Sequence, residues 1–218
     1  MRSYGQYCSA ARALDVVGDR WTLLIIRELL LQGASRYTDL KNGLPGIATN
    51  LLADRIRELE AAGLVAREEA PPPVATTLVR LTEAGAELEP LVRTLSAWGI
   101  RFMAEPIGDD AFRAQWFTYP VEEFLHDRDP AGPAAAIELR ALGGTAVIEI
   151  AGGAVRVAQG PAAAPDLILA GSAQLILGLL TGQLSAAAAT ERGLEITGDG
   201  RLLGRVLPDA APDMAGAP

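Results

Sequence analysis

Residues 48–62 are expected to form a helix with small and polar side chains along one face: Thr49, Asn50, Ala53, Asp54 and Arg57. An asparagine amide can pair with an adenine edge, and an arginine guanidinium can bind guanine or a phosphate. Small residues in the first turn let the backbone approach a groove closely. The same face can instead be an ordinary solvated one, in which Asp54, Arg57 and Glu60 form ion pairs three residues apart. On this helix alone, both interpretations stand.

The opposite face of this helix is predicted to be buried. Leu52, Ile56 and Leu59 follow one another at spacings of four and three, which places them on one side of the helix. Thr49 or Asn50 is expected to cap the start, and Gly63 is expected just after the last helical residue.

The helices that precede residues 48–62 are expected to position this face. The first two lie within residues 13–34 and are separated by Gly18, and the second of them is expected to pack four apolar residues inward before it stops at Gly33. Those four residues are Trp21, Leu24, Ile25 and Leu29. A short helix over residues 38–42 and a turn through Gly43, Pro45 and Gly46 then lead into residues 48–62. This is the helix-turn-helix pattern.

A predicted β-hairpin follows directly, and a hairpin in this place is a wing. Its strands are residues 64–69 and 76–81, joined by the proline-rich tip at residues 70–75. Wings commonly contact the minor groove or phosphates, but this tip contains no lysine or arginine. Arg67 and Arg80 on the arms are therefore the candidate contacts.

One long helix is predicted after the hairpin, with Thr82 as its N-cap. It carries an apolar stripe, and a stripe on a terminal helix needs a partner. Its members are Leu88, Leu91, Val92, Leu95 and Trp98. A second copy of the chain fits best, because a two-fold symmetric dimer places two recognition helices about 34 Å apart on a pseudo-palindromic DNA site.

Composition separates the two halves of the chain. Of its 218 residues, those up to Glu105 carry 12 Lys and Arg against 13 Asp and Glu, and the remainder carries 7 against 14. Any basic surface on the first half is therefore local, and DNA binding there would be sensitive to salt. One cysteine and one histidine, Cys8 and His126, exclude a disulfide framework and leave no metal-ligand cluster. We expect a cytoplasmic protein without a signal peptide or membrane span.

The second half reads as an α+β layer. After an expected linker at residues 104–110 and a helical lead-in at 111–127, three strands form an antiparallel meander with glycine turns, at 135–141, 145–151 and 154–160. A fourth strand at 165–171, one or two helices at 172–193 capped at Ser172, and a strand and short helix at 194–207 complete it. The sequence GDGRLLG at 198–204 is interpreted as a turn rather than a phosphate loop, and His126 as a surface residue. No catalytic arrangement or cofactor site is predicted, so we expect a protein that is not an enzyme.

Residues 8 to about 101 resemble the HxlR-type winged-helix transcription regulators, which are related to the MarR group. The motifs GDRW, LPGI, LADRIRELEAAGL and LTEAG carry this resemblance and occur in the family's order. It implies a homodimer built through the first and last helices, with residues 48–62 in the major groove of double-stranded DNA. Position by position, Thr49, Asn50, Ala53, Asp54 and Arg57 face the groove, and Arg36 and Lys41 are candidates to clamp phosphates.

Cys8 has two interpretations. Some members of this family carry an oxidant-sensing cysteine just before the first helix, and Cys8 occupies a matching place. A lone cysteine is more commonly a small buried hydrophobic residue.

Residues from about 110 to 207 resemble the sterol-carrier-protein-like fold, in which an antiparallel sheet and helices enclose an apolar cavity. This resemblance implies a site for a hydrophobic small molecule, with Ile148, Leu175, Leu179 and Leu180 as candidate lining residues that can equally be plain core. The predicted domains are therefore a winged-helix DNA-binding and dimerisation domain at 1–105, a sterol-carrier-like domain at 106–208 and a flexible tail at 209–218.

Three functional hypotheses follow. The first is a dimeric DNA-binding regulator, a repressor, whose second domain binds a hydrophobic effector that changes the spacing of the recognition helices. The second is a lipid-binding or carrier protein whose helical half is an interaction module. In the third, the second domain only enlarges the dimer interface.

Overall fold

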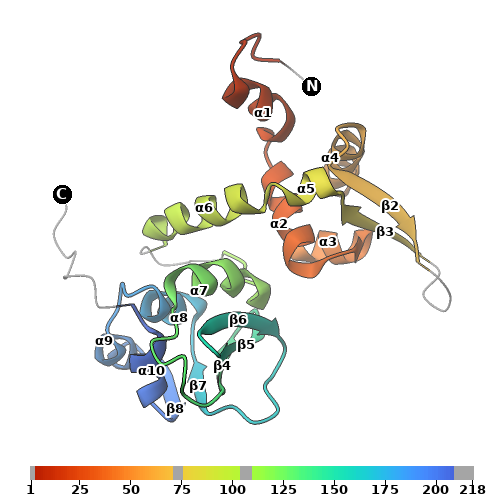
Figure 1. Cartoon of the computed structure of the whole chain (residues 1–218). Helices are drawn as coiled ribbons and strands as arrows, with labels where there is room; N and C mark the ends of the chain where they lie inside the picture. The colour runs from red at the N-terminus through yellow and green to blue at the C-terminus, as the bar shows by residue number, and fades with distance from the viewer. Residues whose placement is uncertain (1–2, 71–75, 104–109, 209–218) are drawn as a thin grey trace. The chain divides into compact units, whose positions relative to one another are not determined.

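The computed structural model describes residues 3–70, 76–103 and 110–208. The expected tip of the hairpin from residue 71 on, the expected linker apart from Asp110, and the expected tail lie outside these residues. Contacts divide the chain into two compact units, residues 1–92 and 93–218 (Figure 1). No described helix is both long and apolar enough to cross a lipid bilayer.

The first unit is a winged helix-turn-helix. Its elements are α1 (Ser9–Val17), α2 (Thr22–Gln32), β1 (Ser35–Arg36), α3 (Tyr37–Gly43), α4 (Thr49–Ala61), β2 (Val65–Glu69), β3 (Thr77–Leu81), α5 (Glu83–Ala86) and the start of α6 (Glu89–Gly99). The strands form an antiparallel sheet in the order β1-β3-β2, with Arg67 opposite Val79. This arrangement confirms the predicted helix-turn-helix and hairpin.

The predicted inward face of α2 is only partly correct. Ile25 and Leu29 are buried, but Trp21 is half-buried and Leu24 is exposed. In α1, Ala11 and Val17 are buried while Leu14 is exposed. Both helices thus keep apolar side chains in solvent in the single chain, although a 3.6-residue period alone indicates burial.

The single long helix predicted from Thr82 onward is wrong. Thr82 does cap a helix, since its hydroxyl oxygen accepts a hydrogen bond from the Gly85 amide at 3.1 Å. That helix, α5, ends at Ala86, and α6 begins only at Glu89. Pro90 explains the break, because a proline inside a continuous helix lacks the amide proton and collides with the carbonyl four residues earlier.

Helix α6 exposes an apolar face. Leu91, Leu95 and Trp98 are each about half exposed, whereas Val92 is buried. Phe102, in the 3₁₀ turn η1 (Ile100–Phe102), continues the series, and the edge of its ring meets the Trp98 ring at 4.8 Å between centroids. The four exposed side chains follow spacings of four, three and four, which places them along one side of the helix.

The second unit is an α+β layer built on a five-stranded sheet. After the 3₁₀ turn η2 (Ala114–Phe117) and α7 (Thr118–Phe124), its elements are β4 (Ala135–Ala141), β5 (Gly144–Ala151), β6 (Ala154–Gln159), β7 (Leu167–Ala170), α8 (Ala173–Leu180), α9 (Ala186–Glu191), β8 (Glu195–Gly198) and α10 (Arg201–Val206). Ser172 and Ser185 cap α8 and α9 with their side chains. The α+β class, the meander β4-β5-β6 and the Ser172 cap are confirmed.

The sheet is mixed rather than antiparallel, which corrects one detail of the prediction. Its order is β6-β5-β4-β7-β8, and β7 runs parallel to β4, with Ile137 opposite Leu167. The chain leaves β6 at one edge and returns to the far side of β4. Glu138 holds this crossover, because its carboxylate accepts a hydrogen bond from the Ala162 amide at 2.7 Å. Such a long-range return leaves no periodic signal in the sequence.

A buried ion pair closes the second unit. The carboxylate of Asp127 accepts hydrogen bonds from Nε and Nη2 of Arg205 at 2.7 and 2.9 Å, and its side chain is fully buried. Arg205 also donates to the carbonyl oxygens of Pro133 and Asp129. This network ties α10 to the segment that precedes β4.

We expect the pair to make the unit sensitive to acid. The Arg205 guanidinium lowers the pKa of Asp127 to about 2, below the value of about 3.9 in an unfolded chain. Because the folded pKa is depressed, the stabilisation is present above about pH 4 and is lost as the pH falls through about 2. Arg205→Gln should reduce proton uptake on unfolding in this window by about one proton.

Urea midpoints measured between pH 2 and 5 would check this. Arg156→Gln, which removes an exposed arginine of β6, is the matched control and should keep the wild-type pH dependence. Parallel pH profiles for Arg205→Gln and the wild type would contradict the assignment.

Candidate nucleic-acid interface

Helix α4 presents the predicted polar face to solvent. Thr49, Asn50, Asp54 and Arg57 are exposed, and Ala53 is half-buried among them. Leu52, Ile56 and Leu59 are buried on the other side, as predicted. The helix ends in a Schellman arrangement: Gly63 has φ of 73° and its amide bonds to the Glu60 carbonyl, while the Leu64 amide bonds to the Leu59 carbonyl.

The predicted N-cap of α4 is wrong. Ala48 occupies that position in an extended conformation and makes no side-chain cap bond, so Thr49 and Asn50 lie inside the first turn. The hydroxyl of Tyr37, at the start of α3, donates a hydrogen bond to the Thr49 carbonyl at 2.5 Å. The side chains of Thr49 and Asn50 are thus not used for capping the helix.

Ion pairs neutralise much of the predicted positive charge. Arg57 pairs with Asp54 three residues earlier, but the two side chains are 67% and 50% exposed, and such surface pairs are weak. Arg67 binds Glu60 at 3.1 Å and Arg80 binds Glu68 at 2.9 Å.

The two predicted phosphate clamps differ from each other. Arg36 is exposed and has no partner among the described residues, whereas the ammonium group of Lys41 donates to the Ile47 carbonyl in the turn before α4. Lys41 therefore braces the helix-turn-helix turn.

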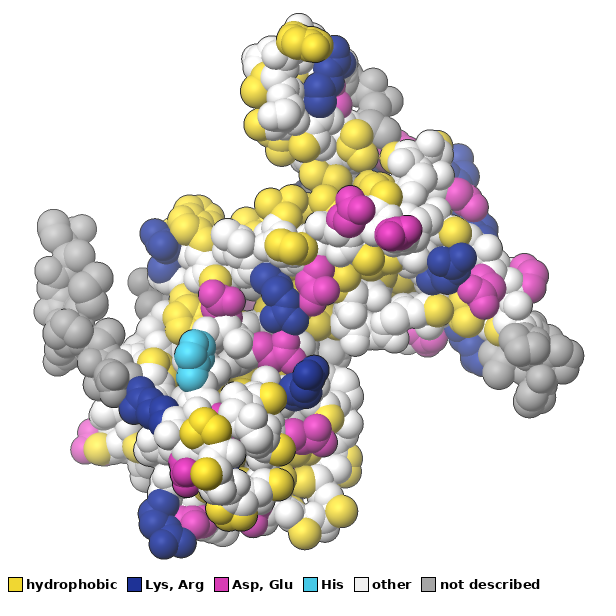
Figure 2. Space-filling model, in the orientation of Figure 1, with side chains coloured by type: hydrophobic (Ala, Val, Ile, Leu, Met, Phe, Trp, Pro, Cys, Tyr) yellow, Lys and Arg dark blue, Asp and Glu magenta, His cyan; other side chains and the backbone are white. Residues whose placement is uncertain are grey.

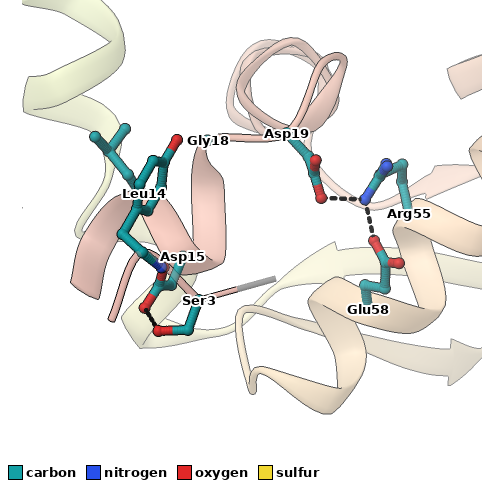
Figure 3. Close-up of a pocket in the computed structure, with 8 residues that line it drawn as sticks. Ser3, Leu14, Asp15, Gly18, Asp19, Arg55 and Glu58 are labelled. Atoms are coloured by element: carbon teal, nitrogen blue, oxygen red, sulfur yellow. Dashed lines mark hydrogen bonds and ion pairs between the residues drawn. The ribbon is translucent and has the colours of Figure 1, made fainter. Parts of the chain in front are cut away.

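An arginine that the sequence reasoning missed, Arg55, fixes α4 to the corner between α1 and α2. Its Nη1 donates to Asp19 at 2.5 Å and also pairs with Glu58 (Figure 3). Beside this contact lies an open cleft of about 690 Å³, and Asp15 contributes a further carboxylate to its lining. Carboxylates outnumber arginines there, so the cleft is unsuited to a phosphate backbone.

Cys8 is exposed and is the N-cap residue of α1. The amides of Ala11 and Ala10 in the first turn lower the pKa of its thiol below the usual value. The interpretation of Cys8 as a buried hydrophobic residue is therefore wrong for this chain.

The four candidate pocket residues of the second unit lie in or against its buried hydrophobic cluster. Ile148, Leu179 and Leu180 are buried, and Leu175 is half-buried and packs against the same cluster. His126 is exposed as predicted. In GDGRLLG, Gly198 ends β8, Asp199 and Gly200 form the turn, and residues 201–204 begin α10, so the turn predicted for this segment covers only its middle. No group of three potential metal ligands occurs in the described parts of the chain.

Comparisons with known proteins agree with this architecture. Residues 16–106 match the HxlR-like helix-turn-helix family, and residues 130–206 match the SCP-2 sterol transfer family. The HTH-type transcriptional regulator YvaP of Bacillus subtilis is 30% identical over 92 residues, which are 42% of this chain and 84% of YvaP. YtcD of the same organism is 34% identical over 55% of this chain and 90% of its own length.

A third relative, YodB of B. subtilis, is 32% identical over 41% of this chain and 80% of its own length. Its structure has been solved in reduced and diamide-treated forms, each 28% identical over 44% of this chain, covering 95% and 96% of the solved chains with TM-scores of 0.38 and 0.37. Mycobacterial HTH-type regulators are 39% identical over 100 residues, and the chain spans 62% of their length. The chain belongs to the HxlR-like family of helix-turn-helix transcriptional regulators, and a domain of the SCP-2 sterol transfer family follows its winged helix.

Proposed function

We propose that the protein is a homodimeric DNA-binding repressor, with a winged-helix domain at residues 1–105, that places α4 in the major groove of a pseudo-palindromic operator. The observation that carries this proposal is the exposed face of α4. Asn50 and Arg57 are exposed there and can reach base edges once Arg57 leaves its surface pair with Asp54, and Thr49 and Ala53 are small enough for close approach. The apolar face of α6 supports the dimer, because one subunit leaves it uncovered.

An anisotropy titration against the DNA upstream of the protein's own gene tests this function. Operator binding should be tighter than binding to an unrelated duplex and should weaken as salt rises. No binding to either duplex at low salt would contradict the proposal and favour the carrier hypothesis.

Arg57→Ala is expected to weaken operator binding by about 1–3 kcal/mol if the guanidinium binds a base through two hydrogen bonds. Leaving the surface pair with Asp54 costs little, so Arg57 can exchange that partner for DNA. Titrations of operators changed at single base pairs should show relaxed discrimination at one position.

Arg201→Ala is the matched control for this variant, since Arg201 forms an exposed surface pair with Asp199 in the second unit, outside the winged helix. Equal operator affinity of Arg57→Ala and the control would exclude the proposed base contact of Arg57. In the carrier hypothesis, Arg57→Ala does not change lipid binding.

We further propose that Cys8 senses oxidants. An exposed thiol with a lowered pKa forms the reactive thiolate more readily near neutral pH. Cys8→Ser should bind the operator like the wild type but should no longer be released by diamide. Diamide-induced release that persists in Cys8→Ser would show that the sensor is not this residue.

The role proposed for the second domain, residues 106–208, is effector binding that biases the arrangement of the dimer. Its family match supports a hydrophobic effector. The burial of Ile148, Leu179 and Leu180 in the hydrophobic cluster instead favours a packed domain without a ligand cavity. Native mass spectrometry of the purified protein, before and after delipidation, separates these two roles.

A further inference from the structure

Uncompensated positive charge is scarce in the first unit. Most of its described arginines are neutralised by a carboxylate within 4 Å: Arg12, Arg27, Arg55, Arg57, Arg67 and Arg80. Among the described residues of this unit, only Arg20 and Arg36 are arginines with no acidic partner. Both are exposed. Arg36 was expected from the sequence to bind phosphate, but Arg20 was not.

Arg20 stands in a corner of the chain that is held tightly in place. Its neighbour Asp19 binds Arg55 of α4 at 2.5 Å. Its other neighbour, Trp21, packs beside the turn before α4, because a Cβ added at Gly46 would lie 3.7 Å from the indole. Trp21 has φ of 79°, a conformation that bulky residues rarely adopt and that its surroundings must enforce. The Arg20 guanidinium lies 5.6 Å from the centre of the Trp21 ring.

This corner and the wing lie on two different sides of α4. Arg55 points toward the corner, and Glu60 points toward β2 through its pair with Arg67. Positions 55 and 60 are five residues apart in sequence, and at about 100° per residue they lie about 140° apart around the helix. The buried residues of α4 lie within the 140° arc between Arg55 and Glu60. The exposed residues Asn50, Asp54 and Arg57 occupy the other arc, so the reading face is flanked by the wing on one side and by Arg20's corner on the other.

We propose that Arg20 binds a DNA phosphate on the flank of α4 that faces away from the wing. A helix in the major groove has a phosphate backbone on each side, and phosphate contacts fix its register. Arg20 does not line the acidic cleft beside Arg55, and its exposed guanidinium lies against the Trp21 ring on this side of α4. This inference rests on the proposed function, since it requires α4 to enter the groove.

The test is the salt dependence of DNA binding by the full-length protein. Each phosphate contact contributes about 0.9 to the slope of log K against log salt, so a dimer of Arg20→Ala should lose about 1.8 of the wild-type slope. Affinity should fall by roughly three- to tenfold for operator and unrelated duplex alike, because a phosphate contact carries no sequence information. Arg20→Lys, which keeps the charge, should retain the slope, and Arg201→Ala, which removes an exposed arginine of the second unit, should behave like the wild type.

The outcomes separate this inference from the proposed function. A wild type that binds its operator, with Arg20→Ala retaining the full slope, would overturn the Arg20 contact and leave the proposed function intact. Loss of discrimination between the duplexes in Arg20→Ala would also overturn it, since that result indicates base readout. A wild type that binds neither duplex would remove the proposed function itself.

Discussion

Replacing Leu95 with aspartate is expected to convert the proposed dimer to monomers and to weaken operator binding by about 10²- to 10⁴-fold. Leu95 lies in the middle of the apolar face of α6 and is 45% exposed in the single chain. A carboxylate introduced there would have to be buried without a partner in a dimer. In a dimer, binding of one subunit to its half-site raises the effective concentration of the second subunit at the other half-site. Monomers lose this gain in affinity, which is about 10²- to 10⁴-fold.

Sedimentation velocity and anisotropy measured on the same samples check this prediction. Leu142→Asp is the matched control, because Leu142 is fully exposed at the turn between β4 and β5 and receives the same charge. Circular dichroism should report an unchanged helix content for both variants. Leu95→Asp that remains dimeric and binds the operator with wild-type affinity would exclude α6 from the interface.

The sequence was most informative where local patterns decide the structure. The buried face of α4 follows from the spacing of Leu52, Ile56 and Leu59, and Gly63 occupies the left-handed position that ends the helix. The cap at Ser172 was equally local. In each case, a backbone or burial requirement within one or two turns selects the residue type.

Predictions failed where the structure is determined by a single helix-breaking residue or by a partner distant in the sequence. Pro90 splits the predicted long helix although the apolar period continues through the break. The parallel pairing of β7 with β4 depends on a chain return fixed by Glu138, which no local period encodes.

The exposed face of α4 was predicted from the sequence, but the ion pairs around it were not. Asn50 and Arg57 are exposed as the helical period required. The partners of Arg67 and Arg80 lie on a different element, so their neutralisation could not be read from nearby positions. Arg20 was missed for the same reason. Its position beside α4 depends on the contact between its neighbour Asp19 and Arg55, which are 36 positions apart in the sequence.

Truncating Leu179 to alanine is expected to destabilise the second unit by about 2–5 kcal/mol. Leu179 is 1% exposed on α8 and belongs to the same buried cluster as Ile148 and Leu180. The substitution removes buried apolar surface and leaves a cavity that the neighbours fill only partly. Hydrogen exchange of the β4 and β5 amides isolates this unit from the first one and reports its opening free energy.

This variant also decides between the core and pocket interpretations of the second domain. A core residue gives the full loss of stability, and palmitate added to the wild type leaves exchange unchanged. A pocket residue gives a loss below about 1 kcal/mol, and palmitate protects the wild type but not the variant. Leu142→Ala is the control, since an exposed leucine truncated at a turn should change stability by no more than about 0.5 kcal/mol. The full loss in Leu179→Ala would make the second domain a packed module whose ligand, if it binds one, must first open the core.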